Sequence, residues 1–224
     1  MAERSDSRRR AFAAIYEQHD WLGGSKSGPG SDPERTAPYR AIVERFLREH
    51  AVRRVLDIGC GDWSTSGLID WSAVDYTGVD VVGEVVDANQ ARHAGPGISF
   101  RRLDAVDDDL PDADLVLIKE VLQHLPTDDV LALLAKVAQY PYVIVVNDIA
   151  HRWRRRWFGR DRWHPMPPTN TDVEPGGYRL LDLRQPPFGV VATSLGTYRN
   201  RFEGAQWVKE VLLLQAAGVT QVQR

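Results

Sequence analysis

A short apolar run that ends at two closely spaced glycines constrains the fold of this 224-residue chain more than any other feature. Residues 55–58 are mostly apolar and lead directly into Gly59 and Gly61, a pattern that predicts a buried strand breaking into a tight loop. Without a Cβ, the glycines let the backbone approach a ligand closely. Asp57 comes just before them, so we expect a nucleotide-type site at the carboxyl end of a strand in an open α/β sheet.

Composition limits the possible classes of protein. A chain with 43% hydrophobic residues and a net charge of -3 is expected to form one main domain, and its charge does not indicate a broadly basic nucleic-acid binder. The only cysteine, Cys60, lies in the glycine loop, which suits a reducing compartment. We recognise no signal peptide and no run of transmembrane length, and therefore expect a cytoplasmic enzyme with no membrane partner.

The order of apolar and amphipathic segments predicts the architecture. Strand patterns alternate with helix patterns, which favours a Rossmann-like, doubly wound and mostly parallel α/β sheet of about seven strands with helices on both faces. Two later apolar segments, separated by the polar residues 197–204, predict a C-terminal antiparallel pair. We expect strands at 53–58, 77–82, 98–103, 113–118, 142–146, 188–194 and 206–215, and helices at 37–50, at 84–93 and from Thr127.

The N-terminal part divides into three segments. Residues 1–10 are mostly charged or small and are expected to be disordered, while residues 11–22 could form a short helix. Residues 23–31 are rich in glycine and serine and form either a flexible linker or a functional lid that wraps an anion. We therefore assign residues 1–36 to an N-terminal segment with a lid, and residues 37–224 to the main domain.

Two further carboxylates extend the pattern. Asp80 lies in the second predicted strand, 21 positions after Gly59, where an acid in this fold binds a ribose diol; the alternative is a turn or cap aspartate. Asp104 follows the third strand and reaches the same edge of the sheet. A dinucleotide site would have a third glycine at position 64, but Ser64 occupies it and the bulky Trp63 precedes it, which weakens that assignment.

Taken together, the Asp57 glycine loop, Asp80, Asp104 and the terminal strand pair resemble the class I S-adenosylmethionine-dependent methyltransferases over residues 37–215. Within that family, Trp21 with residues 27–31 and 119–124 resembles a bacterial branch of sugar and natural-product O-methyltransferases.

The resemblance implies roles for individual residues. Asp57 would help to hold the amino group of the methionine part, Asp80 the ribose hydroxyls and Asp104 the adenine amino group. Carboxylates at this edge suit a ligand that carries a sulfonium and an ammonium. The remaining cofactor contacts that we expect are Gly59, Cys60, Gly61, Val81, Ala105, Lys119, Trp21 and Ser31.

The acceptor needs a base if its reacting atom is a hydroxyl oxygen. His124 is one candidate, although it could equally be a buried structural histidine. His151 is the other, with Asp148 three residues before it to orient the imidazole, and Glu120 is also expected at this catalytic edge. Glu120, Asn147 and Asp148 could bind Mg²⁺ through oxygen ligands; alternatively, the last two are hydrogen-bonding residues that begin a loop.

Residues 152–163 contain six arginines and three tryptophans, and we interpret residues 149–177 as an insertion outside the sheet. Such side chains suit a saccharide, an anionic small molecule or RNA. Because the chain is mildly acidic, a saccharide acceptor is favoured over nucleic acid. The hypothesis is an O-methyltransferase; the alternatives are an RNA or small-molecule N-methyltransferase and a non-catalytic binding module, and a homodimer stays open.

Overall fold

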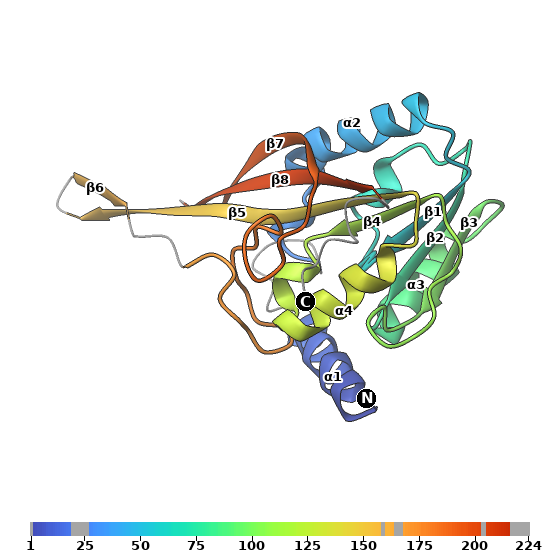
Figure 1. Ribbon diagram of the computed structural model, residues 1–224, viewed down its shortest axis with the longest axis horizontal. Coiled ribbons are helices and arrows are strands. Elements are labelled where there is room, and N and C mark those ends of the chain that lie inside the picture. Colours follow the sequence, from blue (N-terminus) through green and yellow to red (C-terminus); the bar gives the residue numbers. More distant parts are fainter. Residues whose placement is uncertain (1, 19–26, 158–159, 164–167, 203–204, 216–224) are drawn as a thin grey trace.

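A computed structural model describes residues 2–18, 27–157, 160–163, 168–202 and 205–215; within these, the side chains of 2, 3, 18, 29, 151–157, 160–163, 202 and 215 are not described. One sheet dominates the fold, with strand order β3-β2-β1-β4-β5-β8-β7, and β6 pairs with the outer end of β5 (Figure 1). The strands are β1 Arg54–Ile58, β2 Asp75–Asp80, β3 Ile98–Arg102, β4 Leu115–Lys119, β5 Tyr142–Trp157, β6 Arg160–Trp163, β7 Thr193–Phe202 and β8 Ala205–Gln215.

The sheet has the mixed topology expected from the sequence. Strands β1 to β5 pair in parallel, while β8 runs antiparallel to both β5 and β7. The prediction of a mostly parallel sheet with a C-terminal antiparallel pair is therefore confirmed. Both neighbours of β8 contain a bulge, in β5 between Asp148 and Ala150 and in β7 between Ser194 and Gly196.

Helices cover both faces of the sheet, as β4 requires because it is apolar on both sides. The helix α2 (Pro33–Glu49) lies on one side and α4 (Thr127–Val137) on the other (Figure 1). Alternate residues of β4 belong to two cores: Leu115 and Leu117 pack with α2, and Val116 and Ile118 pack with α4. The other helices are α1 Ala2–Gln18, α3 Gly83–His93 and the short η1 Pro29–Ser31, η2 Ser66–Leu68 and η3 Leu122–His124.

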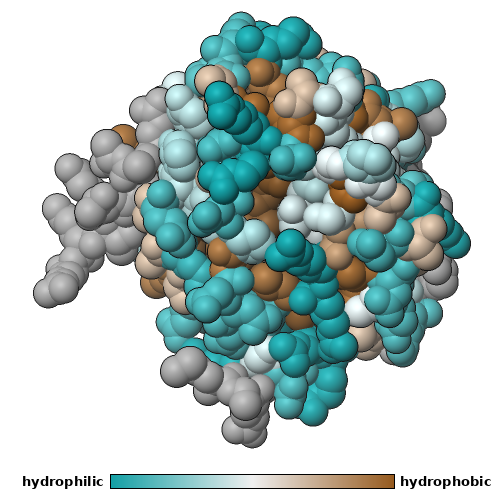
Figure 2. Space-filling view, turned by 90° about the vertical axis from the view of Figure 1, so that its right-hand side faces the viewer, coloured by the Kyte–Doolittle hydropathy of each residue, from teal (hydrophilic) through white to brown (hydrophobic). Residues whose placement is uncertain are grey.

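The surface is mostly polar on the side shown in Figure 2. Hydrophilic side chains predominate toward the edge of this view, and hydrophobic residues show between them nearer its centre (Figure 2). None of the described helices combines the length and the apolar composition needed to cross a bilayer.

The expectation of disorder at residues 1–10 is wrong for residues 2–10, because they belong to the helix α1, while residue 1 lies outside the described residues. The mean composition of the segment is polar, but Arg8 is only 2% exposed and pairs with carboxylates of the main domain. A long-range ion pair of this kind leaves no local signal in the sequence.

The interpretation of residues 149–177 as lying wholly outside the sheet is also wrong. The strand β5 continues to Trp157 and pairs with β8 as far as Trp153 opposite Ala205, and β6 folds back on its end to form a projecting hairpin (Figure 1). Similarly, β7 begins at Thr193 and extends through most of the polar segment expected to be a loop. In the segment before it, Phe188 and Val190 are buried against the α4 side of the sheet.

Candidate active site

A cavity of about 450 Å³ opens at the carboxyl ends of the parallel strands. Ten of the residues expected to hold a cofactor line it: Asp57, Gly59, Cys60, Gly61, Asp80, Val81, Asp104, Ala105, Lys119 and Ser31. Trp21, the remaining one, lies outside the described residues. Glu120, His124 and Asp148 line the same cavity, so it joins the expected cofactor edge to the expected acceptor edge.

The glycine loop has the backbone conformation that its sequence suggests. Gly59 has a φ of 71° and Gly61 a φ of 55°, both in the left-handed region that favours glycine. A Cβ on Gly59 would lie 2.3 Å from Cγ2 of Val121, so this position has no room for any side chain. Trp63 has a φ of 59° and is held in this conformation by burial among Tyr76, His93 and Phe100. The loop thus has a third left-handed position, occupied by tryptophan.

Asp57 is held within the protein by two hydroxyl groups. Its Oδ2 accepts hydrogen bonds from Ser66 Oγ at 2.6 Å and from Tyr76 Oη at 2.7 Å. Burial raises the pKa of Asp57, while these two hydrogen bonds and the charge of Lys119 act in the opposite direction. The carboxylate is thereby fixed at the base of the cavity.

Asp80 ties the glycine loop to β2. Its Oδ2 accepts from the Gly61 N–H at 3.1 Å and its Oδ1 from the Val82 N–H at 3.0 Å. Burial raises the pKa of Asp80, and the backbone N–H groups oppose that rise. Since each carboxylate oxygen can accept more than one hydrogen bond, both oxygens keep capacity for ligand hydroxyls.

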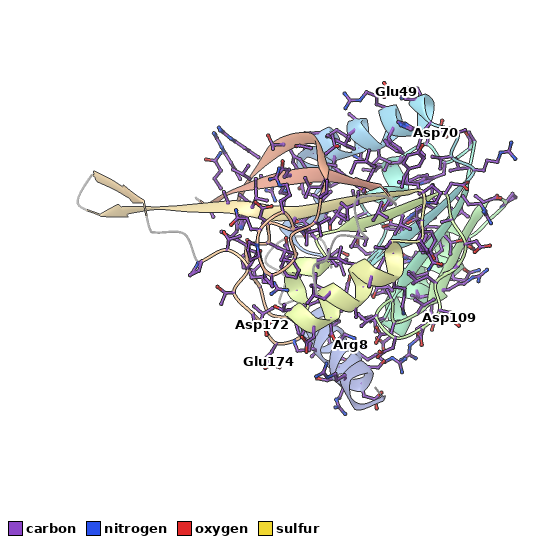
Figure 3. The ribbon with its side chains drawn as sticks, in the orientation of Figure 1. Arg8, Glu49, Asp70, Asp109, Asp172 and Glu174 are labelled. Atoms are coloured by element: carbon purple, nitrogen blue, oxygen red, sulfur yellow. The ribbon has the colours of Figure 1, made fainter. Side chains whose placement is uncertain are left out.

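Asp104 is bound by side chains of α1, a contact that was not predicted from the sequence. The Arg8 guanidinium lies 3.0 Å from Oδ2 of Asp104 and 2.8 Å from Oδ2 of Asp129, and it also pairs with Asp107. Ser5 donates to Asp104 at 2.7 Å. Figure 3 shows Arg8 on α1 close to α4. The helix α1 is therefore fastened across one side of the cavity.

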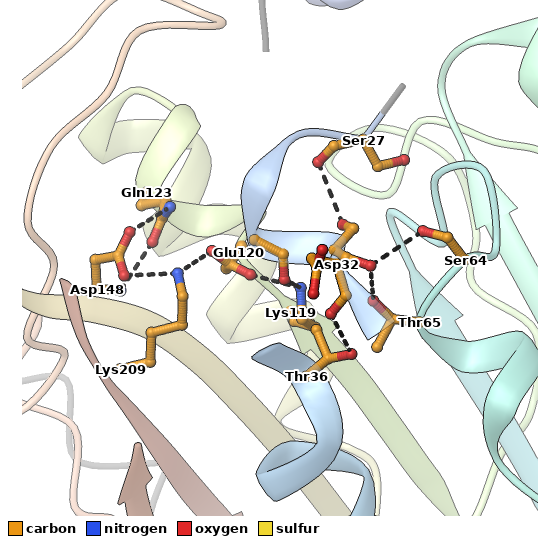
Figure 4. A network of polar contacts seen from close by, with 12 residues as sticks. Ser27, Asp32, Thr36, Ser64, Thr65, Lys119, Glu120, Gln123, Asp148 and Lys209 are labelled. Carbon is orange, nitrogen blue, oxygen red and sulfur yellow. Dashed lines mark hydrogen bonds and ion pairs between the residues drawn. The ribbon is translucent and has the colours of Figure 1, made fainter. Parts of the chain in front are cut away.

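The described part of the glycine- and serine-rich segment packs on the glycine loop (Figure 4). Ser27 Oγ accepts from the Asp62 N–H at 2.9 Å, and the Gly30 carbonyl accepts from Lys119 Nζ at 3.0 Å. The Ser31 carbonyl accepts from the hydroxyls of Ser64 and Thr65, both at 3.4 Å. These contacts favour the lid interpretation over a free linker.

A chain of ion pairs lines the cavity next to Gly30 (Figure 4). Lys209 Nζ lies 2.7 Å from Oδ1 of Asp148 and also pairs with Glu120, which in turn pairs with Lys119. Burial alone would raise the pKa of Glu120, but the charges of Lys119 and Lys209 outweigh it and lower that pKa. Burial raises the pKa of Asp148, partly offset by Lys209. Lys209 was not among the predicted site residues, although a lysine next to a glutamate within an apolar strand is a recognisable signal.

The predicted Mg²⁺ site is not formed. The Lys209 ammonium already lies between the carboxylates of Glu120 and Asp148, where a divalent ion would have to bind. In the register of β5 and β8, Asn147 lies opposite Glu210, and the next residue, Asp148, lies opposite Lys209. The side chains of Asn147 and Asp148 therefore point to opposite faces of β5. Within the described ranges, no group of three His, Cys, Asp or Glu side chains could hold a metal ion.

His124 is a buried, neutral imidazole. Its Nδ1 lies 2.7 Å from the Gly177 carbonyl, which can only accept, so Nδ1 carries the proton and Nε2 is the basic nitrogen. Burial lowers the pKa of His124 to about 4, against the opposing effects of the Gly177 hydrogen bond and Glu120. His151 lies opposite Trp207 in the register of β5 and β8, but its side chain, and hence its predicted pairing with Asp148, lies outside the described residues.

Comparison with known proteins agrees with this geometry. A family model described as a methyltransferase domain matches residues 55–140, which is less than half of the chain. No curated protein matches. Among solved structures, a 1,6-didemethyltoxoflavin N1-methyltransferase from Burkholderia thailandensis has a TM-score of 0.62 and 16% identity, covering 96% of this chain and 90% of the other.

Two further structures have the same fold. Magnesium protoporphyrin IX methyltransferase from Synechocystis PCC 6803 gives a TM-score of 0.56 at 16% identity, covering 91% of this chain and 97% of the other. The N-terminal domain of EvdMO1 gives 0.52 at 17% identity, covering 79% and 82%. This chain spans only 64% of another match, the methyltransferase domain of a bacterial Hen1 protein. The chain therefore has the fold of the class I methyltransferases, and its residues 55–140 match a methyltransferase domain family.

Proposed function

We propose that this protein is an S-adenosylmethionine-dependent methyltransferase that moves a methyl group to a hydroxyl oxygen of a small polar acceptor, a saccharide or glycoside. The observation that carries this proposal is the single cavity that joins the carboxylates of Asp57 and Asp80 to the imidazole of His124. The Burkholderia and Synechocystis enzymes were solved with bound S-adenosylhomocysteine, and the EvdMO1 domain in the presence of that compound and D-fucose.

The residues present fit this cofactor. Asp57 and Asp80 place negative charge where the ammonium and the ribose hydroxyls would lie, and the glycine loop leaves room for the backbone to approach them. When bound, S-adenosylmethionine supplies an electrophilic methyl group on a sulfonium. Holding the acceptor oxygen in line with that methyl group contributes much of the rate, and the walls of the cavity serve this purpose.

His124 is the base in this proposal. With Nδ1 donating to Gly177, its Nε2 is the nitrogen that would accept the proton of the acceptor hydroxyl, in place of the hydrogen bond that the side-chain amide of Gln123 donates to it at 3.4 Å. Because burial lowers the pKa of His124 to about 4, the imidazole is unprotonated throughout the neutral range, as a base must be before it reacts, but it is a weaker base than an ordinary histidine. The ion pairs of Lys209 hold Asp148 and Glu120 in place around the acceptor. His151 stays the alternative base.

A second candidate is methyl transfer to nitrogen, which the Burkholderia N1-methyltransferase carries out by its name. A neutral nitrogen nucleophile needs no base before attack, so His124→Gln would leave N-methylation largely intact while it slows O-methylation. The net charge of -3 disfavours RNA as the acceptor. If RNA were the acceptor, its binding should weaken steeply as the salt concentration rises.

The proposal is tested in two steps. Calorimetry should show binding of S-adenosylhomocysteine, weakened by about tenfold or more in Asp80→Ala because a hydrogen-bonding carboxylate is lost. Asp70→Ala is the matched control, since Asp70 lies on the surface (Figure 3). Transfer of a tritium-labelled methyl group is then measured against saccharides, small acids, amines and RNA. A chain that binds no S-adenosylhomocysteine would instead be a non-catalytic binding module.

A further inference from the structure

Asn200 is a buried amide that lacks a hydrogen-bond partner. It lies on β7, is 3% exposed and lines the cavity. Neither its Oδ1 nor its Nδ2 has a hydrogen-bond partner among the described residues. Burying a carboxamide with both groups unpaired is costly, and natural proteins seldom do so without a reason. A ligand in the cavity would satisfy both groups at once.

The neighbours of Asn200 are brought together by the register of the antiparallel strands. Asn200 lies opposite Trp207, and Tyr198 lies opposite Lys209, so Asn200 and Lys209 share a face of the β7–β8 ribbon with Trp207. Trp207 and Lys209 also line the cavity, as does Tyr178 from the preceding loop. We call Asn200, Trp207, Tyr178 and Lys209 the acceptor wall.

Tyr178 and Lys209 of the acceptor wall already form hydrogen bonds within the protein, whereas the amide of Asn200 can still form hydrogen bonds to a ligand. Tyr178 Oη donates to Asp148 Oδ2 at 3.2 Å, and Lys209 is bound to the carboxylates of Asp148 and Glu120. The two lysines and two carboxylates of this network cancel in charge, so the wall offers no net charge to attract a phosphate or a carboxylate. Recognition must therefore depend on neutral hydrogen bonds and on the face of the Trp207 indole.

A primary amide presents a donor and an acceptor side by side. Two adjacent hydroxyl groups on a ring complement it, because each can donate or accept, and the C–H face of the same ring can pack on an indole. We propose that Asn200, with Trp207 beside it, binds a vicinal diol of a cyclic sugar acceptor. The inference rests on the proposed function and names the group by which the saccharide is recognised.

The test uses the full chain with Asn200→Leu, which keeps the side-chain size and removes both polar groups. Binding of methyl hexopyranosides, methyl 6-deoxyhexopyranosides and their monodeoxy counterparts is measured by saturation-transfer NMR, with and without S-adenosylhomocysteine. We expect at least one diol-bearing pyranoside to bind the wild type, with a Kd about 10- to 100-fold higher for Asn200→Leu, as the loss of two neutral hydrogen bonds would give. The affinity for S-adenosylhomocysteine should be unchanged.

Two comparisons make the result specific. A pyranoside that lacks one hydroxyl of the recognised diol should bind the wild type more weakly and lose little more in Asn200→Leu. Thr197→Val, at an exposed position of the same strand, should bind like the wild type. Asn200→Leu should also unfold at the same temperature as the wild type or higher, because it removes a buried amide that has no protein partner.

Three results would overturn the inference. The first is that no pyranoside binds the wild type, and the second is that pyranosides bind Asn200→Leu equally well, because water alone then satisfies the amide. The third is that Asn200→Leu lowers the unfolding temperature, which would show that Asn200 has a structural role. Failure of the proposed function is recognised separately. If S-adenosylhomocysteine does not bind but a pyranoside binds in an Asn200-dependent manner, the methyltransferase proposal fails and the sugar site stands.

Discussion

Replacing Arg8 by methionine should release α1 from the main domain. The Arg8 side chain is buried and is shared by the carboxylates of Asp104, Asp107 and Asp129. Removing one partner of a buried ion pair commonly costs about 3–5 kcal/mol, because the charge left behind is uncompensated. In this protein, lifting α1 would expose the three carboxylates to water. The loss of global stability is therefore limited to the free energy that holds α1 in place, and the effect should concentrate in that helix.

Hydrogen exchange and calorimetry measure this directly. In Arg8→Met the amides of α1 should exchange much faster while those of β4 keep their protection. Since Phe12 and Tyr16 of α1 line the cavity together with Arg8, the affinity for S-adenosylhomocysteine should fall by about tenfold or more, equivalent to 1.4 kcal/mol or more.

Arg4→Met provides the matched control on the same helix. Arg4 lies 3.6 Å from Asp128, and the two side chains are 70% and 74% exposed, so their pair should contribute only about 0–1 kcal/mol. If Arg8→Met kept the α1 protection and the ligand affinity of Arg4→Met, the buried ion pairs would not be what holds the helix, and the reasoning would be refuted.

Three further predictions concern the rest of the site. Because burial lowers the pKa of His124 from 6.5 to about 4, the folded chain binds fewer protons than the unfolded chain between these pH values. The free energy of unfolding should therefore fall as the pH drops through this window, by up to roughly 3 kcal/mol. Urea titrations at a series of pH values should show a smaller fall for His124→Gln than for the wild type. Gly59→Ala should lower the free energy of unfolding, measured in urea, by about 2–5 kcal/mol, because the left-handed backbone is strained for alanine and its Cβ would lie 2.3 Å from Val121. Adding Val121→Ala should recover only the share of this loss that comes from the clash with Val121. EDTA should leave methyl transfer unchanged, because the Lys209 ammonium already compensates the two carboxylates at the predicted metal position.

Each of these has an outcome that contradicts it. An acid profile of His124→Gln that matches the wild type would mean that the histidine titrates normally in the folded state. Full rescue of Gly59→Ala by Val121→Ala would show that the backbone conformation carries no strain. Loss of turnover in EDTA, with recovery on adding Mg²⁺, would show that Lys209 gives way to a metal ion.

Much of the fold could be predicted because its signals are local. The run ending at Gly59, the spacing to Asp80 and the position of Asp104 all reflect strands whose ends meet at one edge, and the structure places these residues around one cavity. The alternation of strand and helix patterns was sufficient to predict a mostly parallel sheet. The left-handed conformation of Trp63 could not be read from its side chain, because burial by three aromatic rings maintains it.

The acceptor side depends on contacts between distant residues. Lys209 meets Glu120 across 89 positions and Arg8 meets Asp104 across 96, and neither pair has a local pattern. The charged segment around Arg154 and Arg156 reads as solvated loop, yet its backbone extends β5, since pairing with β6 decides its conformation. Asn200 could be assigned to the cavity only when the register of β7 and β8 was known.

The two bulges beside β8 have a consequence for how this protein could change its acceptor. Each adds one residue to a strand whose partner continues without interruption, and each reverses which side chains of that strand face the cavity beyond that point. Deleting Ile149 or Leu195 would remove the bulge while the residues beyond it keep their partners on β8, so the cavity-facing residues would stay the same. One residue gained elsewhere in β5 or β7, without a second bulge to absorb it, would instead turn the side chains beyond it to the other face. A one-residue insertion of that kind in either strand would thus be a short evolutionary route to a different acceptor, with the cofactor edge left untouched.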